Sequence, residues 1–212
     1  MSHPAQLTPT HGFSMYKLIL VLLAVVIGWK LLTYSSEVSY GPGVMAPDEP
    51  QQEALDPPVS FKFDQFTVTK VADFRIKAKV LSKEGYYFDR EADLSPVDLA
   101  LGWGKMSDES IIEQIQTSQS GRLYRWRVDS FPIPRREIET QSANMHLIPA
   151  NKFVAKVIGD VRKGDIVEFS GSLVNAVSDE DGWRWTTSLT RNDTGNGACE
   201  LIWVESFRVV TY

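Results

Sequence analysis

Few residues in the chain have the chemistry expected of a catalytic site, and several of them lie in the segment RNDTGNGACE, residues 191–200. Its Asp-Thr-Gly tripeptide, 193–195, matches the one that bears the catalytic carboxylate of aspartic proteases. Such a carboxylate must be buried beside a second one so that the pair shares a proton. Here polar residues precede the tripeptide, and Asn196 and Gly197 follow it, which is typical of an exposed turn. We therefore interpret the segment as a hairpin loop.

A second group of polar residues lies in SANMHLIPAN, residues 142–151, where Ser142, Asn144 and His146 alternate. On an extended chain these three side chains share one face, and all of them can donate or accept hydrogen bonds. This spacing allows a small polar pocket. The alternative interpretation is that His146 only braces a loop before Pro149.

Cys199 is the only cysteine of the chain. It would be a candidate nucleophile if His146 reached it as a base and Asp193 or Glu200 oriented that base. A lone cysteine at the start of an alternating strand is more typical of a small buried side chain. One cysteine and one histidine beyond residue 11 do not suggest a metal site, so we predict no metal, no cofactor and no assigned catalytic residue.

The clearest basic cluster is interleaved with aromatic residues. It consists of Arg122, Arg125, Arg127, Arg135 and Arg136, with Tyr124, Trp126 and Phe131 among them. Guanidinium groups bind phosphate and carboxylate groups well, so this cluster would suit a phosphate, a lipid headgroup or an acidic polysaccharide. Strand alternation also explains Arg125 and Arg127 as a solvated face. We predict a ligand or partner surface formed by Arg125, Arg127, Arg135 and Arg136 together with Ser142, Asn144 and His146.

The charge of the chain limits its partners. The formal net charge is -5, so no long-range attraction to phosphate backbones is expected, and we predict no binding to nucleic acid. The oligomeric state is not indicated.

The elements that carry these residues are mostly strands. FRIKAKVL, residues 74–81, alternates between apolar residues and Arg75, Lys77 and Lys79, which predicts a strand with one solvated face. Residues 60–70 and 123–128 alternate similarly. Segments 164–176, 182–190 and 199–210 predict three final strands, which short links would join into an antiparallel meander.

Helical signals are fewer. Residues 107–119 begin with a candidate N-cap, Ser107 or Asp108, and residues 150–161 predict a second short helix. The pattern predicts a mainly β domain, either a β-barrel, of which the OB type is one example, or an α+β sandwich, with one or two short helices.

The N-terminal region predicts a single membrane pass. Twelve uncharged residues, 18–29, lie between Lys17 and Lys30, and we expect residues 15–34 to form a transmembrane signal anchor. A cleaved signal peptide is the alternative, although no small-residue cleavage motif follows. Residues 1–14 would be a short tail, residues 35–58 a Pro/Gly-rich tether and residues 59–212 the β-rich domain. Acidic residues without Lys or Arg between Lys30 and Lys62 favour an N-terminus in the cytoplasm.

Four segments resemble a family of uncharacterised bacterial proteins with one N-terminal membrane segment. They are GPGVMAPDEPQQ, EADLSPVDLALGWGKMSD, FPIPRREIETQSANMHLIPAN and DGWRWTTSLTRNDTGNGACELIWVE. The resemblance implies a bacterial inner-membrane protein with its C-terminal domain in the periplasm, and it transfers no catalytic residue. We expect a non-enzymatic binding or assembly-accessory domain that contacts the bilayer through residues 15–34 and binds an envelope protein or an anionic envelope ligand. The alternative is an envelope hydrolase or transferase that uses His146 with Ser142 or Cys199.

Overall fold

The computed structural model describes residues 15–33, 37–88, 90–190 and 199–212. The chain divides into two compact units, Met1–Ser36 and Glu37–Tyr212. In the first unit, helix α1 (Met15–Thr33) contains the apolar run. Within the residues that the structure describes, no helix has both the length and the apolar character required to cross a membrane. The span predicted at residues 15–34 therefore stays a prediction from the sequence.

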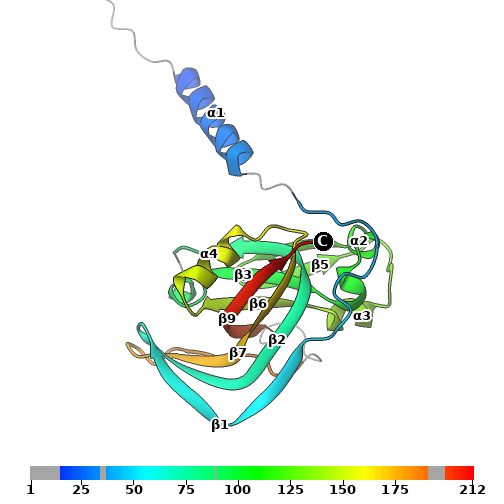
Figure 1. Ribbon diagram of the computed structural model, residues 1–212. Helices are drawn as coiled ribbons and strands as arrows, with labels where there is room; N and C mark the ends of the chain where they lie inside the picture. The colour runs from blue at the N-terminus through cyan, green and yellow to red at the C-terminus, as the bar shows by residue number, and fades with distance from the viewer. Residues whose placement is uncertain (1–14, 34–36, 89, 191–198) are drawn as a thin grey trace, which may run out of the picture. The chain divides into compact units, whose positions relative to one another are not determined.

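The second unit is mainly β, as predicted, and its centre is a ring of five paired strands (Figure 1). Around the ring, the order is β2, β3, β6, β9 and β7, and β7 pairs with β2 to close it. All neighbours are antiparallel except β6 and β9, which are parallel. These strands are β2 (Phe66–Gly85), β3 (Val97–Gly102), β6 (Ser142–Pro149), β7 (Ile166–Ser178) and β9 (Glu200–Val210).

The predicted alternation of β2 is confirmed on its apolar face, because Phe74, Ile76 and Val80 are all buried in the core. Burial of these side chains supplies the main driving force for closing the ring. On the opposite face, Lys79 was expected to be solvated, and this expectation is wrong: its side chain is 1% exposed. Its ammonium group is buried because it is paired with Glu109, 30 positions further along the chain.

Helix α4 (Lys152–Asp160) confirms the helix predicted at residues 150–161. It begins after Asn151, whose side chain accepts hydrogen bonds from the backbone N–H groups of Phe153 and Val154. Val154 and Ile158 are buried in the same core cluster as β6 and β9 residues, so the helix packs against the ring.

A long connection, residues 103–141, joins β3 to β6 and carries most of the remaining small elements. The helix predicted at residues 107–119 is wrong over most of its length: α2 ends after one turn, and residues 116–120 form a strand. The polar sequence QTSQS lacks the apolar period that would extend the helix. The elements are η2 (Gly104–Ser107), α2 (Glu109–Ile112), β4 (Gln116–Ser120), β5 (Leu123–Arg127) and α3 (Arg135–Thr140).

The last three predicted strands do not form a meander. β7 and β8 (Arg184–Trp185) are an antiparallel pair, but β9 pairs with the first part of β7 and not with β8. Both lie on the edge of β7 opposite β2, and β9 is inserted between β7 and β6. β7 and β9 approach closely at Gly171, where an added Cβ would lie 1.8 Å from the carbonyl oxygen of Trp203. A glycine is required at this point.

Residues 37–58, expected to be a tether, belong to the second unit. Residues 51–58 are part of the edge strand β1 (Gln51–Phe63), which pairs with the first half of β2, and η1 (Arg90–Asp93) follows β2. The residues before β1 lie along the domain: the N–H of Val38 donates to the carbonyl oxygen of Lys163, and Val44 forms a bridge with Asp108. We call residues 37–46 the N-terminal strap.

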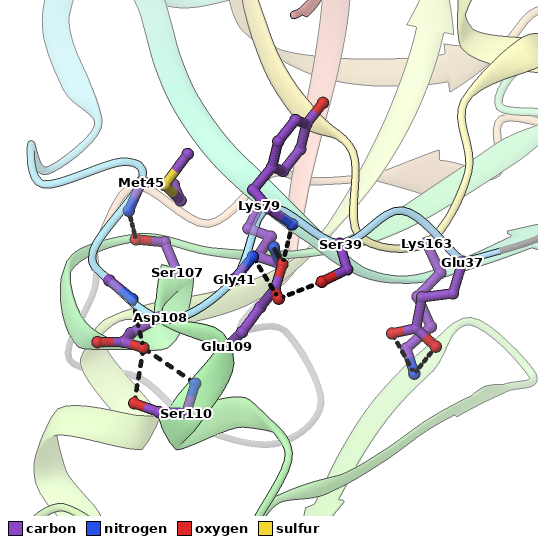
Figure 2. Close-up of polar contacts among 12 residues, drawn as sticks. Glu37, Ser39, Gly41, Met45, Lys79, Ser107, Asp108, Glu109, Ser110 and Lys163 are labelled. Atoms are coloured by element: carbon purple, nitrogen blue, oxygen red, sulfur yellow. Dashed lines mark hydrogen bonds and ion pairs between the residues drawn. The ribbon is translucent and has the colours of Figure 1, made fainter. Parts of the chain in front are cut away.

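The strap is held by the side chains of residues 107–109 (Figure 2). Glu109 accepts hydrogen bonds from the hydroxyl group of Ser39 and from the N–H groups of Tyr40 and Gly41, and its Oε1 lies 2.6 Å from the ammonium nitrogen of Lys79. Burial alone would raise the pKa of Glu109, but the hydrogen bonds from Lys79, Ser39 and Tyr40 lower it to about 2. A buried carboxylate that is ionised at neutral pH therefore fastens the strap to the domain.

Candidate functional site

A hairpin formed by β4 and β5 places the guanidinium group of its turn residue Arg122 on the outer face of the β3–β6 pair. Ser120 pairs with Leu123, which leaves Gly121 and Arg122 as a two-residue turn. Both turn residues have positive φ, 56° and 67°, as a type I′ hairpin turn requires. Residues other than glycine rarely adopt this conformation, so contacts with neighbouring groups must hold Arg122 in it.

Those neighbouring groups are a buried carboxylate and an aromatic ring. The guanidinium group of Arg122 donates to Asp98 Oδ1 on β3 at 3.0 Å and to the carbonyl oxygen of Ser95 at 2.7 Å. It lies 3.7 Å from the centre of the Tyr86 ring. Burial, followed by the nearby Asp98 charge, raises the pKa of Tyr86 to about 12, so the phenol stays neutral. Its oxygen accepts a hydrogen bond from the backbone N–H of Arg122.

His146 on β6 shares the same carboxylate oxygen. Its Nδ1 lies 2.8 Å from Asp98 Oδ1, and Asp98 and His146 are 0% and 2% exposed. Burial alone would lower the pKa of His146, but hydrogen bonds to Asp98 and to the Cys199 thiol raise it to about 9. Trp185 of β8 packs on the imidazole, with ring centres 4.7 Å apart. His146 is therefore an imidazolium at neutral pH, placed between a carboxylate and a sulfur atom.

Asn144, two residues earlier on β6, connects the hairpin to the sulfur atom. Its Oδ1 accepts a hydrogen bond from Gln119, and its Nδ2 donates to the carbonyl oxygen of Arg122 at 3.0 Å and lies 4.0 Å from Cys199 Sγ. Asn144 is 4% exposed, whereas Cys199 is partly exposed. Cys199 is the one member of this cluster that is partly exposed. We call Asp98, Asn144, His146 and Cys199 the thiol cluster.

The predicted polar pocket is thus divided. Asn144 and His146 belong to the thiol cluster, whereas Ser142 donates to the carbonyl oxygen of Ile138 and lies near the Tyr124 hydroxyl group. Glu200, one proposed orienting acid, is buried at the start of β9, and the structure instead places Asp98 against His146. The Asp-Thr-Gly segment, 193–195, lies outside the described residues.

Most of the arginines predicted to form a ligand or partner surface lie together in space, and the binding role itself stays a prediction. Three of its four members, Arg125, Arg127 and Arg135, line one open surface hollow of about 630 Å³, and Arg136 does not line it. Trp126 and the exposed Phe131 lie in the same hollow with ring centres 6.2 Å apart. We call this hollow the arginine groove.

The charges of the arginine groove are only partly compensated. Arg135 pairs with Glu139 at 2.8 Å and lies over the Trp126 ring. Arg125 donates to the Ser120 hydroxyl group, and neither Arg125 nor Arg127 forms an ion pair with any residue in the described part of the chain. The groove therefore presents two guanidinium groups that have no ion-pair partner among the described residues, beside exposed aromatic surface and the carboxylate of Asp129.

Comparisons with protein-family models, with curated proteins and with solved structures gave no match. The site is therefore interpreted from its own geometry.

Two features of this site were not predicted from the sequence: the presence of Asp98 and the pairing of Arg122 with it. Asp98 lies in the apolar run PVDLALG, and a lone acid inside such a strand must be paired if it is buried. That was the available signal. The identity of the partner could not be read, because Arg122 reaches it through a tertiary contact over 24 positions.

Proposed function

We propose that residues 37–212 form an OB-type binding domain, and that its ligand is an anionic component of the cell envelope held in the arginine groove. The observation that carries this proposal is that Arg125 and Arg127, which form no ion pair within the described residues, lie beside Trp126 and Phe131 in the groove. Guanidinium groups that are planar and weakly hydrated bind phosphate, sulfate or carboxylate groups in a bidentate manner. Exposed aromatic rings add apolar contact area for the rest of the ligand.

The strand order supports the OB type. In chain order the ring strands run first, second, third, fifth and fourth, the third and fifth are parallel, and α4 lies between the third and fourth. OB barrels bind oligonucleotides and oligosaccharides on the face of their second and third strands. Here those strands are β3 and β6, and the β4–β5 hairpin is bonded onto them through Asn144 and Asp98. We infer that the ligand surface has moved to the outer side of this hairpin.

The membrane attachment is part of the same proposal. It is supported by the uncharged run at residues 18–29, with a lysine on each side, and by the acidic segment that follows. We propose a single pass through a bacterial inner membrane at residues 15–34, with the domain in the periplasm. Anionic headgroups and acidic polysaccharides would then be present in the compartment that contains the domain.

Binding by the full-length chain in a non-ionic detergent tests the function. One arm uses dextran sulfate as a soluble polyanion, and the other uses mixed micelles that contain phosphatidylglycerol. The double variant Arg125→Glu/Arg127→Glu should weaken binding about tenfold or more, equivalent to roughly 1.4 kcal/mol, and added salt should reduce the difference.

The matched control is Lys152→Glu/Arg75→Glu, which makes the same change of charge at exposed positions outside the groove. This control should bind like the wild type in whichever of the two assays, dextran sulfate or phosphatidylglycerol micelles, detects binding. Equal loss in the control would mean that net charge alone governs binding, and an unchanged groove variant in both arms would disprove the proposal.

A further inference from the structure

The thiol cluster supports chemistry that the binding function does not use. It joins a nucleophile, an imidazolium and a buried carboxylate in one line: Cys199 contacts His146, and His146 Nδ1 lies 2.8 Å from Asp98 Oδ1. Since Nδ1 faces the carboxylate, the other ring nitrogen is left for the sulfur. A carboxylate that fixes the orientation of a histidine beside a nucleophile is the arrangement used in triad enzymes.

The exposure of the cluster is also that of a reaction site. Asp98, Asn144 and His146 are at most 4% exposed, whereas Cys199 is partly exposed, so an electrophile from solvent would approach the cluster at Cys199 and not at the supporting groups. Packing fixes these supporting groups. Trp185 covers the imidazole, Arg122 holds Asp98, and Gln119 holds the amide of Asn144.

A hydrogen-bond donor also lies where negative charge would develop. Asn144 Nδ2 is 4.0 Å from Cys199 Sγ. When a sulfur atom adds to a carbonyl group, the resulting oxyanion is one bond further from the sulfur than the attacked carbon, which brings it toward such a donor. Donors directed at this oxygen contribute strongly to acyl transfer.

We propose that Cys199 is the nucleophile of an acyl-transfer site for esters or thioesters, with His146 as proton carrier, Asp98 as the residue that positions it, and Asn144 as oxyanion donor. The reacting form of Cys199 is the thiolate, which has given its proton to solvent; its sulfur bonds to the carbonyl carbon while the π electron pair moves onto oxygen. Collapse of this adduct breaks the bond to the leaving alkoxide or thiolate, which takes the proton of the imidazolium. The acyl group remains on Cys199 as a thioester.

Water completes the reaction. It attacks the thioester carbon while the now neutral His146 takes one of its protons, and the carboxylic acid leaves as the sulfur is released. The titratable groups that face the imidazole are Asp98 and Cys199, with the charged Arg122 beyond Asp98. The raised pKa of His146 agrees with an imidazolium that is ready to protonate the leaving group.

The test uses the full-length chain and p-nitrophenyl acetate as the probe, with intact-mass analysis to detect one acetyl group and peptide mapping to locate it. We expect label on Cys199 in the folded protein at a rate well above that of the same protein in denaturant. His146→Gln should reduce the acylation rate by about a hundredfold or more. Ser170→Ala, on the β7–β9 surface, is the matched control and should react like the wild type.

Alkylation by iodoacetamide separates catalysis from structural support, because it displaces iodide from carbon and forms no oxyanion. Asn144→Ala should slow acylation about a hundredfold but slow alkylation far less. Circular dichroism checks that each variant is folded. Because His146→Gln and Asn144→Ala are made separately, either one that folds keeps the test decisive. Acylation of Cys199 no faster in the folded than in the denatured chain, or an unaffected His146→Gln variant, would overturn the proposal.

Discussion

The N-terminal strap gives the sharpest test of how the domain is stabilised. Glu109→Ala removes the acceptor of hydrogen bonds from Ser39, Tyr40 and Gly41 and leaves the ammonium group of Lys79 buried without its partner. Loss of one partner of a buried ion pair costs about 3–5 kcal/mol, chiefly because the remaining charge is uncompensated. We expect the free energy of unfolding to fall by an amount in this range.

Urea unfolding of the full-length chain in detergent, followed by tryptophan fluorescence, measures this change. Glu113→Ala is the matched control, because Glu113 is exposed at the end of the same helical turn, and it should change stability by less than about 0.5 kcal/mol. The double variant Lys79→Met/Glu109→Ala removes both charges, so it should be more stable than Glu109→Ala alone.

Proteolysis and acid provide independent readings. Chymotrypsin should cleave after Tyr40 faster in Glu109→Ala, since this residue is then released from the domain. The folded-state pKa of Glu109, about 2, lies below the ordinary value of 4.5, so its contribution is complete above pH 4.5 and is lost as the pH falls toward 2. A Glu109→Ala variant as stable as Glu113→Ala, with unchanged cleavage after Tyr40, would refute the reasoning.

Three further predictions concern the domain. The pKa of His146 is about 9 in the folded state, against an ordinary value of 6.5. Its contribution to stability is therefore complete below pH 6.5 and is lost as the pH rises through 9. The difference in the free energy of unfolding between wild type and His146→Gln should shrink over this interval. Asn151→Ala removes a helix cap and should lower stability by about 1 kcal/mol in urea unfolding, and a wild-type midpoint would contradict the cap. Gly171→Ala should lower the free energy of unfolding by about 1–3 kcal/mol or more, because its Cβ would meet the Trp203 carbonyl oxygen. Gly159→Ala, in open space on α4, should cause no such loss, and thermal denaturation of both variants measures the difference.

The strands were predicted best where apolar and polar residues alternate, because this pattern identifies the face of the strand that is buried. Phe74, Ile76 and Val80 follow that rule, and the core confirms them. Lys79 breaks it, because a residue distant in the chain neutralises its charge within the domain. Periodicity reports the local preference of a strand for a buried face, and it contains no information about such partners.

The candidate site shows the same division. Asn144 and His146 were grouped correctly because spacing on one strand fixes a shared face. Ser142 has the same spacing, but the carbonyl oxygen of Ile138 engages its hydroxyl group. Asp98 lies beside His146 only because of the register in which β3 pairs with β6. This register cannot be predicted from the sequence, because a long connection separates the two strands and packing of the whole domain sets their register.

The position of the N-terminal strap also determines how the domain responds to mechanical load. A force applied to the chain before Glu37 must first peel off the strap, which is held by Glu109, and then β1, before it reaches any strand of the closed ring. The arginine groove and the thiol cluster lie on elements that follow β1 in the chain. Traction from the N-terminal helix would therefore be absorbed by two detachable layers while the groove and the thiol keep their geometry.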